Sequence, residues 1–312
     1  MRTLMVLFVV CGAAALVAAP LAIGAARAAK TEAAGPQAAA TDANVKEFVY
    51  KKTPQGELKI FVHFPPDWKA TDKRPAIVFF FGGGWTGGTP TQFLTQAAYL
   101  ATRGMVAARA DYRVKSRQGT TPVECVEDAK SAVRWLRQKA GELGIDTDRV
   151  VAAGGSAGGH IAACTALVED LDAKDEDKSV SSKPNAMVLF NPVVDLVSLV
   201  NEKLGEKDAE TAKKISPILY IKKDTPPAIF FYGTTDRFFA QGQAFLAKSK
   251  EIGNRAELYS AEGMPHGFFN KSPWTEVTLR KADEFLTSLG YLKGEPTLKL
   301  PEGATQTLKK EP

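Results

Sequence analysis

The stretch Gly154–His160, which reads Gly-Gly-Ser-Ala-Gly-Gly-His, constrains the fold of this chain more than any other feature. It follows the short apolar run Val150–Ala153 and precedes the helix-like run Ile161–Val168. An apolar run of this length, followed by glycines and then a longer apolar segment, predicts a buried strand that turns sharply into a helix. Ser156 is predicted to lie at the tip of that turn.

The Gly-x-Ser-x-Gly pattern indicates a nucleophile, and the reason is steric. A serine at so tight a turn has a strained backbone, and side chains at positions 154 and 158 would collide with neighbouring elements, so glycine is needed at both. The N–H of Ala157 then lies at the positive end of the following helix, where it would stabilise an oxyanion. Taken alone, the five residues also fit a glycine-rich turn that merely exposes a serine.

Strand-like and helix-like segments alternate along most of the chain. The predicted strands are Pro75–Phe81, Met105–Ala110, Val150–Ala153, Ala186–Phe190, Ala228–Tyr232 and Ala256–Tyr259. The predicted helices between and after them are Pro90–Arg103, Pro122–Ala140, Ile161–Val168, Phe238–Ile252 and Pro273–Leu289. This alternation predicts an α/β fold, with a mostly parallel central sheet and helices on both of its faces. We place it in one catalytic domain, residues 45–292, which opens with a hairpin.

The N-terminus is typical of an exported protein. Arg2 precedes the apolar run Leu4–Ile23, and Ala26-Arg27-Ala28 matches a small-residue cleavage site. We therefore predict a signal peptide over residues 1–28, a disordered linker over residues 29–44, and a periplasmic or secreted mature protein. The alternative is a retained membrane anchor, because the apolar run approaches spanning length. Removal of the signal would leave no stable membrane association.

Charge, cysteines and the C-terminus add little about function. Loss of Arg2 and Arg27 with the signal peptide would lower the formal net charge from +5 to +3, and this small excess does not indicate nucleic-acid binding. Cys125 and Cys164 would remain. An exported protein could pair them in a disulfide, but buried free thiols are the default expectation. The tail over residues 293–312, with its prolines and lysines, is predicted to be loose.

A serine nucleophile requires a base, and the chain has three histidines. His63 falls within a predicted strand, and His160 falls in the first turn of the helix after Ser156. His266 lies in the loop 263–267, directly after the last predicted strand, and a loop can carry an imidazole to the serine. We therefore predict that His266 is the base.

A carboxylate must orient that imidazole and stabilise its charged form. Asp236 follows the strand Ala228–Tyr232 at its carboxyl end, which is the edge of an open α/β sheet where sites assemble. Asp195, after the strand that ends at Phe190, is the rival position. We prefer Asp236, because Asp195 could instead hold its loop by accepting backbone N–H groups.

The glycine triplet Gly82-Gly83-Gly84 follows a central strand and precedes Trp85. Backbone N–H groups of Gly83 and Gly84 can meet the oxyanion that forms on a substrate carbonyl, because no side chains hinder the approach. The loop around Trp85 and the segment Val194–Lys223 are predicted to shape the substrate pockets.

These features together resemble the α/β-hydrolase fold, and specifically its hormone-sensitive-lipase-like esterase branch, which includes acetyl-xylan and feruloyl esterases. The resemblance covers about residues 45–290. Further matching positions are Asp111-Tyr112-Arg113, Pro122, Asp128 and Trp135. One position departs from the pattern: Phe81 stands where that branch usually has a histidine before the glycines, so a polar group that would order the loop is missing.

The resemblance implies a catalytic triad and an oxyanion hole. The triad would be Ser156, Asp236 and His266, and the oxyanion donors would be Gly83, Gly84 and Ala157. It also implies a serine carboxylic ester hydrolase that works through an acyl-enzyme, on small-molecule or carbohydrate esters of short acyl groups, and it implies neither a metal nor an organic cofactor. The alternatives are a peptide or amide hydrolase of the same fold and a catalytically silent binding protein. Oligomeric state is left open.

Overall fold

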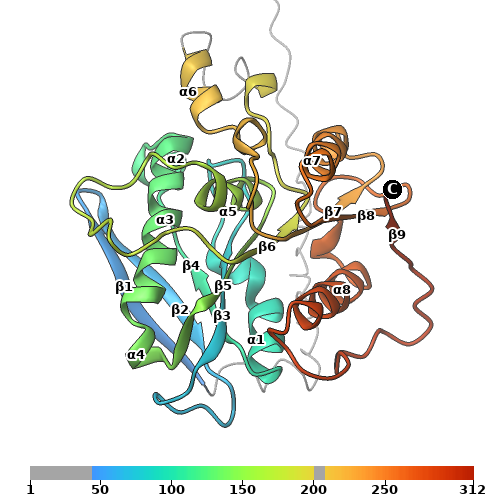
Figure 1. Cartoon of the computed structure of the whole chain (residues 1–312), viewed down its shortest axis with the longest axis horizontal. Helices are drawn as coiled ribbons and strands as arrows, with labels where there is room; N and C mark the ends of the chain where they lie inside the picture. The colour runs from blue at the N-terminus through green and yellow to red at the C-terminus, as the bar shows by residue number, and fades with distance from the viewer. Residues whose placement is uncertain (1–43, 200–207) are drawn as a thin grey trace, which may run out of the picture. The chain divides into compact units, whose positions relative to one another are not determined.

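A computed structural model of the chain describes residues 44–199 and 208–312 (Figure 1). The predicted signal peptide and the linker up to residue 43 lie outside these residues, as does the part of the segment Val194–Lys223 from 200 to 207. The described residues all belong to one compact unit, Pro36–Pro312.

A nine-stranded sheet in the order β1-β2-β4-β3-β5-β6-β7-β8-β9 forms the centre of the fold. The strands are β1 Val45–Thr53, β2 Gly56–His63, β3 Arg74–Phe80, β4 Val106–Ala110, β5 Ile145–Gly155, β6 Ala186–Phe190, β7 Ala228–Gly233, β8 Ala256–Ala261 and β9 Lys309–Lys310. From β4 to β8 each pair of neighbours is parallel, whereas β1, β2 and β9 join antiparallel at the two edges. The prediction of a mostly parallel sheet is confirmed.

Helices cover both faces of this sheet (Figure 1). The longer helices are α1 Leu94–Thr102, α3 Pro122–Gln138, α5 Ala157–Leu167, α7 Phe239–Glu251 and α8 Trp274–Ser288. The short ones are α2 Lys115–Gln118, α4 Ala140–Leu143 and α6 Ala209–Lys214, with 3-10 turns η1 Pro90–Phe93, η2 Val197–Leu199, η5 Pro217–Tyr220 and η6 Phe268–Asn270. Helices α3, α5 and α7 bury their apolar side chains in one core, and α1 and α8 bury theirs in the other.

Strand β3 shows how its sequence supplies both cores. Its side chains alternate, so that Val78 and Phe80 enter the core beneath α3 and α5 while Ile77 and Phe79 enter the core beneath α1 and α8. All four are at most 1% exposed. Each such side chain contributes about 1.5–3 kcal/mol when removed from water, which explains why this run is apolar throughout.

Local signals set where α3 begins. Thr121 accepts a hydrogen bond from a backbone N–H of the first turn, and the Glu124 side chain accepts one from the Thr121 N–H in return. With Pro122 as its first residue, the helix starts at a complete capping box. The helix then carries the buried Asp128, which pairs with Arg113 and Lys51.

The C-terminal tail differs from its prediction. Residues 293–312 are not loose, because β9 pairs antiparallel with β8 and the Ser260 hydroxyl donates to Glu311 Oε1 at 2.5 Å. Leu298 is only 7% exposed, and its N–H donates to Tyr99 Oη at 3.2 Å. The composition of the tail suggested a solvated segment. In the tertiary fold, however, the tail covers an apolar surface and pairs with the edge of β8, which would otherwise be unpaired.

Two smaller expectations concern thiols and membranes. Cys125 and Cys164 are both buried and free, as the default expectation has it. Among the described residues, no helix has the length and apolar character needed to span a membrane.

Candidate active site

Ser156 occupies a strained turn between β5 and α5. Its backbone dihedrals are φ 54° and ψ −120°, a region that side-chain-bearing residues rarely adopt. A Cβ on Gly158 would lie 2.0 Å from the carbonyl oxygen of Phe80, and a Cβ on Gly154 would lie 2.5 Å from the backbone carbon of Gly158. Both glycines are therefore sterically required, as the sequence pattern predicts.

The structure brings Ser156, His266 and Asp236 into one hydrogen-bonded chain. Ser156 Oγ lies 2.7 Å from His266 Nε2, and His266 Nδ1 lies 2.7 Å from Asp236 Oδ2. Because the carboxylate only accepts, Nδ1 carries the proton and Nε2 is left as the acceptor for the serine hydroxyl. An imidazole in this tautomer can take a proton from Ser156.

Asp236 is well placed to hold this imidazole. Its side chain is fully buried, and its second oxygen accepts the Phe238 N–H at 2.9 Å. The Phe238 ring meets the His266 ring edge-on, with centroids 5.3 Å apart. Asp195 has the other role considered for it, because its side chain accepts the Val197 N–H at 2.8 Å within its own loop.

The imidazoles of the other two histidines have partners other than Ser156 and are kept neutral. His160 is fully buried, with Trp85 Nε1–H donating to its Nδ1 at 3.1 Å, and burial lowers its pKa to about 4. His63 accepts from Arg109 Nε at 2.8 Å, and burial together with the nearby guanidinium lowers its pKa to about 4 as well. Neither imidazole is hydrogen-bonded to the serine.

The predicted oxyanion donors belong to residues that lie beside Ser156 in space or in sequence. Gly83 and Gly84 line the cavity that contains Ser156, and Ala157 is the first residue of α5. Within the described part of the chain, the N–H groups of Gly83, Gly84 and Ala157 have no hydrogen-bond acceptor. Three donors beside one nucleophile are what a developing oxyanion requires.

Phe81, which replaces the histidine of the resembled pattern, orders the oxyanion loop by packing. Its ring stacks on Tyr112 with centroids 4.1 Å apart, and Tyr112 Oη donates to the Phe81 carbonyl at 2.6 Å. Both residues are buried. The loop therefore keeps its shape through an aromatic stack and one buried hydrogen bond in place of an imidazole.

A cavity of about 420 Å³ opens over Ser156. Besides the predicted site residues, the side chains or backbone that line it come from Gly82, Trp85, Gln92, Asn191, Val193, Leu199, Arg237, Phe238, Gly267, Phe269 and Asn270. Trp85 and Leu199 belong to the two segments predicted to shape the pockets. Sequence reasoning missed Gln92, Asn191 and Asn270. Only Asn191 had a usable signal, which is its position directly after strand β6.

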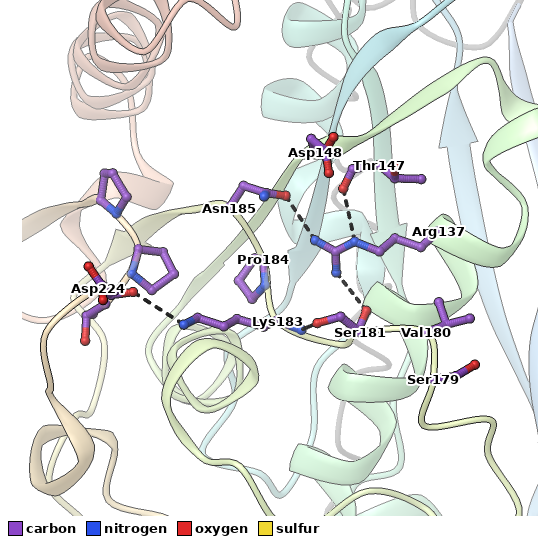
Figure 2. A pocket seen from close by; sticks show the side chains of 13 residues that line it. Arg137, Thr147, Asp148, Ser179, Val180, Ser181, Lys183, Pro184, Asn185 and Asp224 are labelled. Carbon is purple, nitrogen blue, oxygen red and sulfur yellow. Dashed lines mark hydrogen bonds between the residues drawn. The ribbon is translucent and has the colours of Figure 1, made fainter.

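A larger hollow, about 830 Å³, lies at the opposite edge of the sheet, where Asn185 and Pro227 precede β6 and β7. Figure 2 shows its one arginine, Arg137, with its guanidinium hydrogen-bonded to Thr147, Ser181 and Asn185. The hollow contains none of the reactive groups described above. Ser156 and His266 line the smaller cavity instead.

This fold and this serine, histidine and aspartate arrangement are those of an α/β-hydrolase. Comparison with known proteins places the chain more narrowly. It belongs to the family described as BD-FAE, whose model matches residues 62–250.

Curated relatives include several esterases. The chain is 29% identical over 245 residues to a probable isoprenylcysteine alpha-carbonyl methylesterase of Oryza sativa, covering 71% of this chain and 56% of that protein. It is 27% identical over 214 residues to the probable carboxylic ester hydrolase LipM of Mycobacterium tuberculosis, covering 62% and 49%. The chain thus spans about half the length of the curated relatives it matches.

Solved structures give a fuller match. Esterase 2 of Thermogutta terrifontis, in a form phosphorylated by paraoxon, is 47% identical with a TM-score of 0.76, and the match covers 81% of this chain and 97% of that one. The same esterase with propionate bound is 46% identical with a TM-score of 0.77, again over 81% and 97%.

Proposed function

We propose that this protein is a serine carboxylic ester hydrolase that works through an acyl-enzyme. The observation that carries the proposal is the hydrogen-bonded chain from Ser156 through His266 to Asp236, whose serine shares a cavity with Gly83 and Gly84. In the first step, Ser156 Oγ attacks the ester carbonyl carbon while His266 Nε2 takes its proton. The carbonyl oxygen becomes an oxyanion that the N–H groups of Gly83, Gly84 and Ala157 stabilise.

The intermediate then collapses and releases the alcohol. His266 returns the proton to the departing alkoxide oxygen, which leaves the acyl group bonded to Ser156. A water molecule repeats the sequence, with His266 taking its proton as it attacks the acyl carbon. The second oxyanion collapses, the bond between the acyl carbon and Ser156 Oγ breaks, and His266 returns the proton to Oγ as the acid leaves. Asp236 keeps the proton on Nδ1 in place and stabilises the imidazolium in both halves.

For the substrate, we propose esters of short acyl groups, including those on carbohydrates. The support is the modest cavity, walled in part by Phe238, Phe269 and Leu199, and the similarity to an esterase whose structures hold propionate and butyrate. A cavity of this size and apolar lining accommodates a few methylenes, each of which contributes about 0.8 kcal/mol when buried. Longer chains would extend into water.

The test is hydrolysis of p-nitrophenyl acetate, butyrate and octanoate and of acetylated xylan. We expect turnover that falls with acyl length, and a loss of about 10⁴-fold or more in Ser156→Ala, because the nucleophile is removed while the oxyanion donors stay. Ser288→Ala, which changes a serine of α8, serves as the matched control and should keep full activity. Unchanged turnover in Ser156→Ala, or none in folded wild-type protein, would contradict the proposal.

We also propose that the chain is exported and then cleaved after Ala28. The support is the apolar run Leu4–Ile23 with Ala26-Arg27-Ala28 behind it. Expression of the full chain in a Gram-negative host, followed by N-terminal sequencing, should give a mature protein that begins at Ala29 in the periplasm or medium. Recovery of a chain that keeps the apolar run, in the membrane fraction, would refute cleavage.

A further inference from the structure

A line of side-chain carboxamides joins two loops of the site that are far apart in sequence. Gln92, in η1, accepts the N–H of Gly82 on its Oε1 at 2.5 Å and donates from its Nε2 to Asn270 Oδ1 at 3.0 Å. Asn270, in η6, donates from its Nδ2 to the carbonyl of Gly267 at 3.0 Å. The oxyanion loop is thereby linked to the residue that follows His266.

The direction of every bond in this line is determined by its ends. Gly82 can only donate and the Gly267 carbonyl can only accept, so the oxygen of Gln92 must face Gly82 and the nitrogen of Asn270 must face Gly267. One bond between the two carboxamides then remains, and it has a donor and an acceptor in the correct places. Three consistent hydrogen bonds give the line a single arrangement.

The backbone of Gly267 extends the line of hydrogen bonds towards the imidazole. Its N–H donates to Asn191 Oδ1 at 3.1 Å, which turns the Asn191 amide nitrogen towards His266 Nε2, 3.4 Å away. Asn191 is fully buried at the end of β6, and its own N–H donates to the Phe231 carbonyl at 2.6 Å. The histidine loop is thus held on one side by the sheet and on the other by Asn270.

We propose that Gln92 and Asn270 are positioning residues, which hold the oxyanion donors and His266 in register with each other. This inference rests on the proposed esterase function. The oxyanion loop carries Phe81 where a histidine would offer polar contacts, and Gln92 supplies a polar contact to the first glycine of the triplet. The donors and the base act on the same substrate carbonyl, and a displacement of about 1 Å between such groups can lower a rate by about 100-fold.

Gln92→Met and Asn270→Leu are the test variants, because each keeps most of the side-chain volume and removes its hydrogen bonds. We expect kcat for p-nitrophenyl acetate to fall by about 10-fold to 100-fold in each, with KM changed by less than about 2-fold. Phosphonylation of Ser156 by a p-nitrophenyl phosphonate should slow in parallel, since its phosphoryl oxygen uses the same donors. The kcat of the double variant should be only slightly lower than that of the slower single variant, because either change alone breaks the line of hydrogen bonds.

Thr91→Ala is the matched control. Thr91 neighbours Gln92 in η1, and its hydroxyl is hydrogen-bonded to the Thr89 hydroxyl, so its replacement should leave kcat within about 2-fold. Melting temperatures of all variants separate positioning from folding. Asn270 is exposed, so Asn270→Leu keeps the test available even if Gln92→Met fails to fold.

Two outcomes would overturn the inference. One is that both single variants, Gln92→Met and Asn270→Leu, are folded and have the wild-type kcat. The other is that KM rises while kcat is unchanged, which would indicate that these side chains only contact the substrate. Wild-type protein that hydrolyses no ester would instead overturn the proposed function. The two failures are therefore distinguishable in the same assay.

Discussion

At the scale of single residues, His160 shows how a histidine near a serine nucleophile can have a purely structural part. Trp85 Nε1–H donates to its Nδ1, so the proton must sit on Nε2, which donates to the carbonyl of Ile215 at 2.6 Å. His160 thereby joins the oxyanion loop to the segment that follows β6. A second proton would place an N–H against the Trp85 N–H in a fully buried site, so the neutral form is strongly preferred.

This preference predicts an acid-sensitive contribution to stability. The pKa of His160 falls from 6.5 to about 4 on folding, mainly through burial, and that of His63 does the same. Well above pH 6.5 both histidines are neutral in the folded and in the unfolded chain, and the full stability is present. As pH falls from about 6.5 to about 4, the unfolded chain binds protons that the folded chain does not, so the free energy of unfolding decreases.

Replacement of His160 isolates its contribution to the loss of stability at low pH. In His160→Gln, the amide oxygen can accept from Trp85 and the amide nitrogen can donate to Ile215, but nothing titrates. Urea unfolding at pH 7.5 and pH 4.5 gives the decrease in the free energy of unfolding between these pH values. We expect this decrease to be smaller than in wild type by up to about 3 kcal/mol. An identical decrease in both proteins would contradict the prediction. His63 is unchanged in the variant, so its contribution to the pH dependence of stability remains.

At the scale of elements, the C-terminal segment completes the sheet. Strand β8 would otherwise be an open edge, and β9 covers it while the Glu311 N–H donates to the Leu258 carbonyl at 2.8 Å. Upstream, Tyr99 accepts from two backbone N–H groups of the segment and donates to the buried Asp283. The segment is anchored at both ends by groups of the folded domain.

Removal of residues 304–312 should therefore destabilise the domain. We expect a loss of about 1–3 kcal/mol and a melting temperature lower by several degrees, together with a greater tendency to aggregate through the exposed β8 edge. Lys310→Ala is the control, since the Lys310 side chain is 59% exposed in its ion pair with Glu257, and a surface pair of this kind contributes about 1 kcal/mol or less. Equal melting temperatures for the truncated and full-length proteins would show that the pairing is not significant in solution.

At the scale of the whole molecule, the parallel sheet explains why the site lies where it does. The carboxyl ends of β3, β5, β6, β7 and β8 share one edge, and they lead to the oxyanion loop, Ser156, Asn191, Asp236 and the loop of His266 in that order. Ser156 and His266 are 110 residues apart in sequence and 2.7 Å apart in space. The edge gathers these groups because every parallel strand points the same way.

The turn at Ser156 was determined by the sequence alone, because the collisions that require Gly154 and Gly158 arise within a few residues of the serine or against the neighbouring strand. The alternation of strands and helices was determined in the same way, through local apolar patterns. The tertiary structure decided what depends on distant partners: that Asp236 and not Asp195 meets His266, that Gln92 and Asn270 join two loops, and that the tail closes the sheet. Such contacts form between segments brought together only by packing, and no short stretch of sequence contains them.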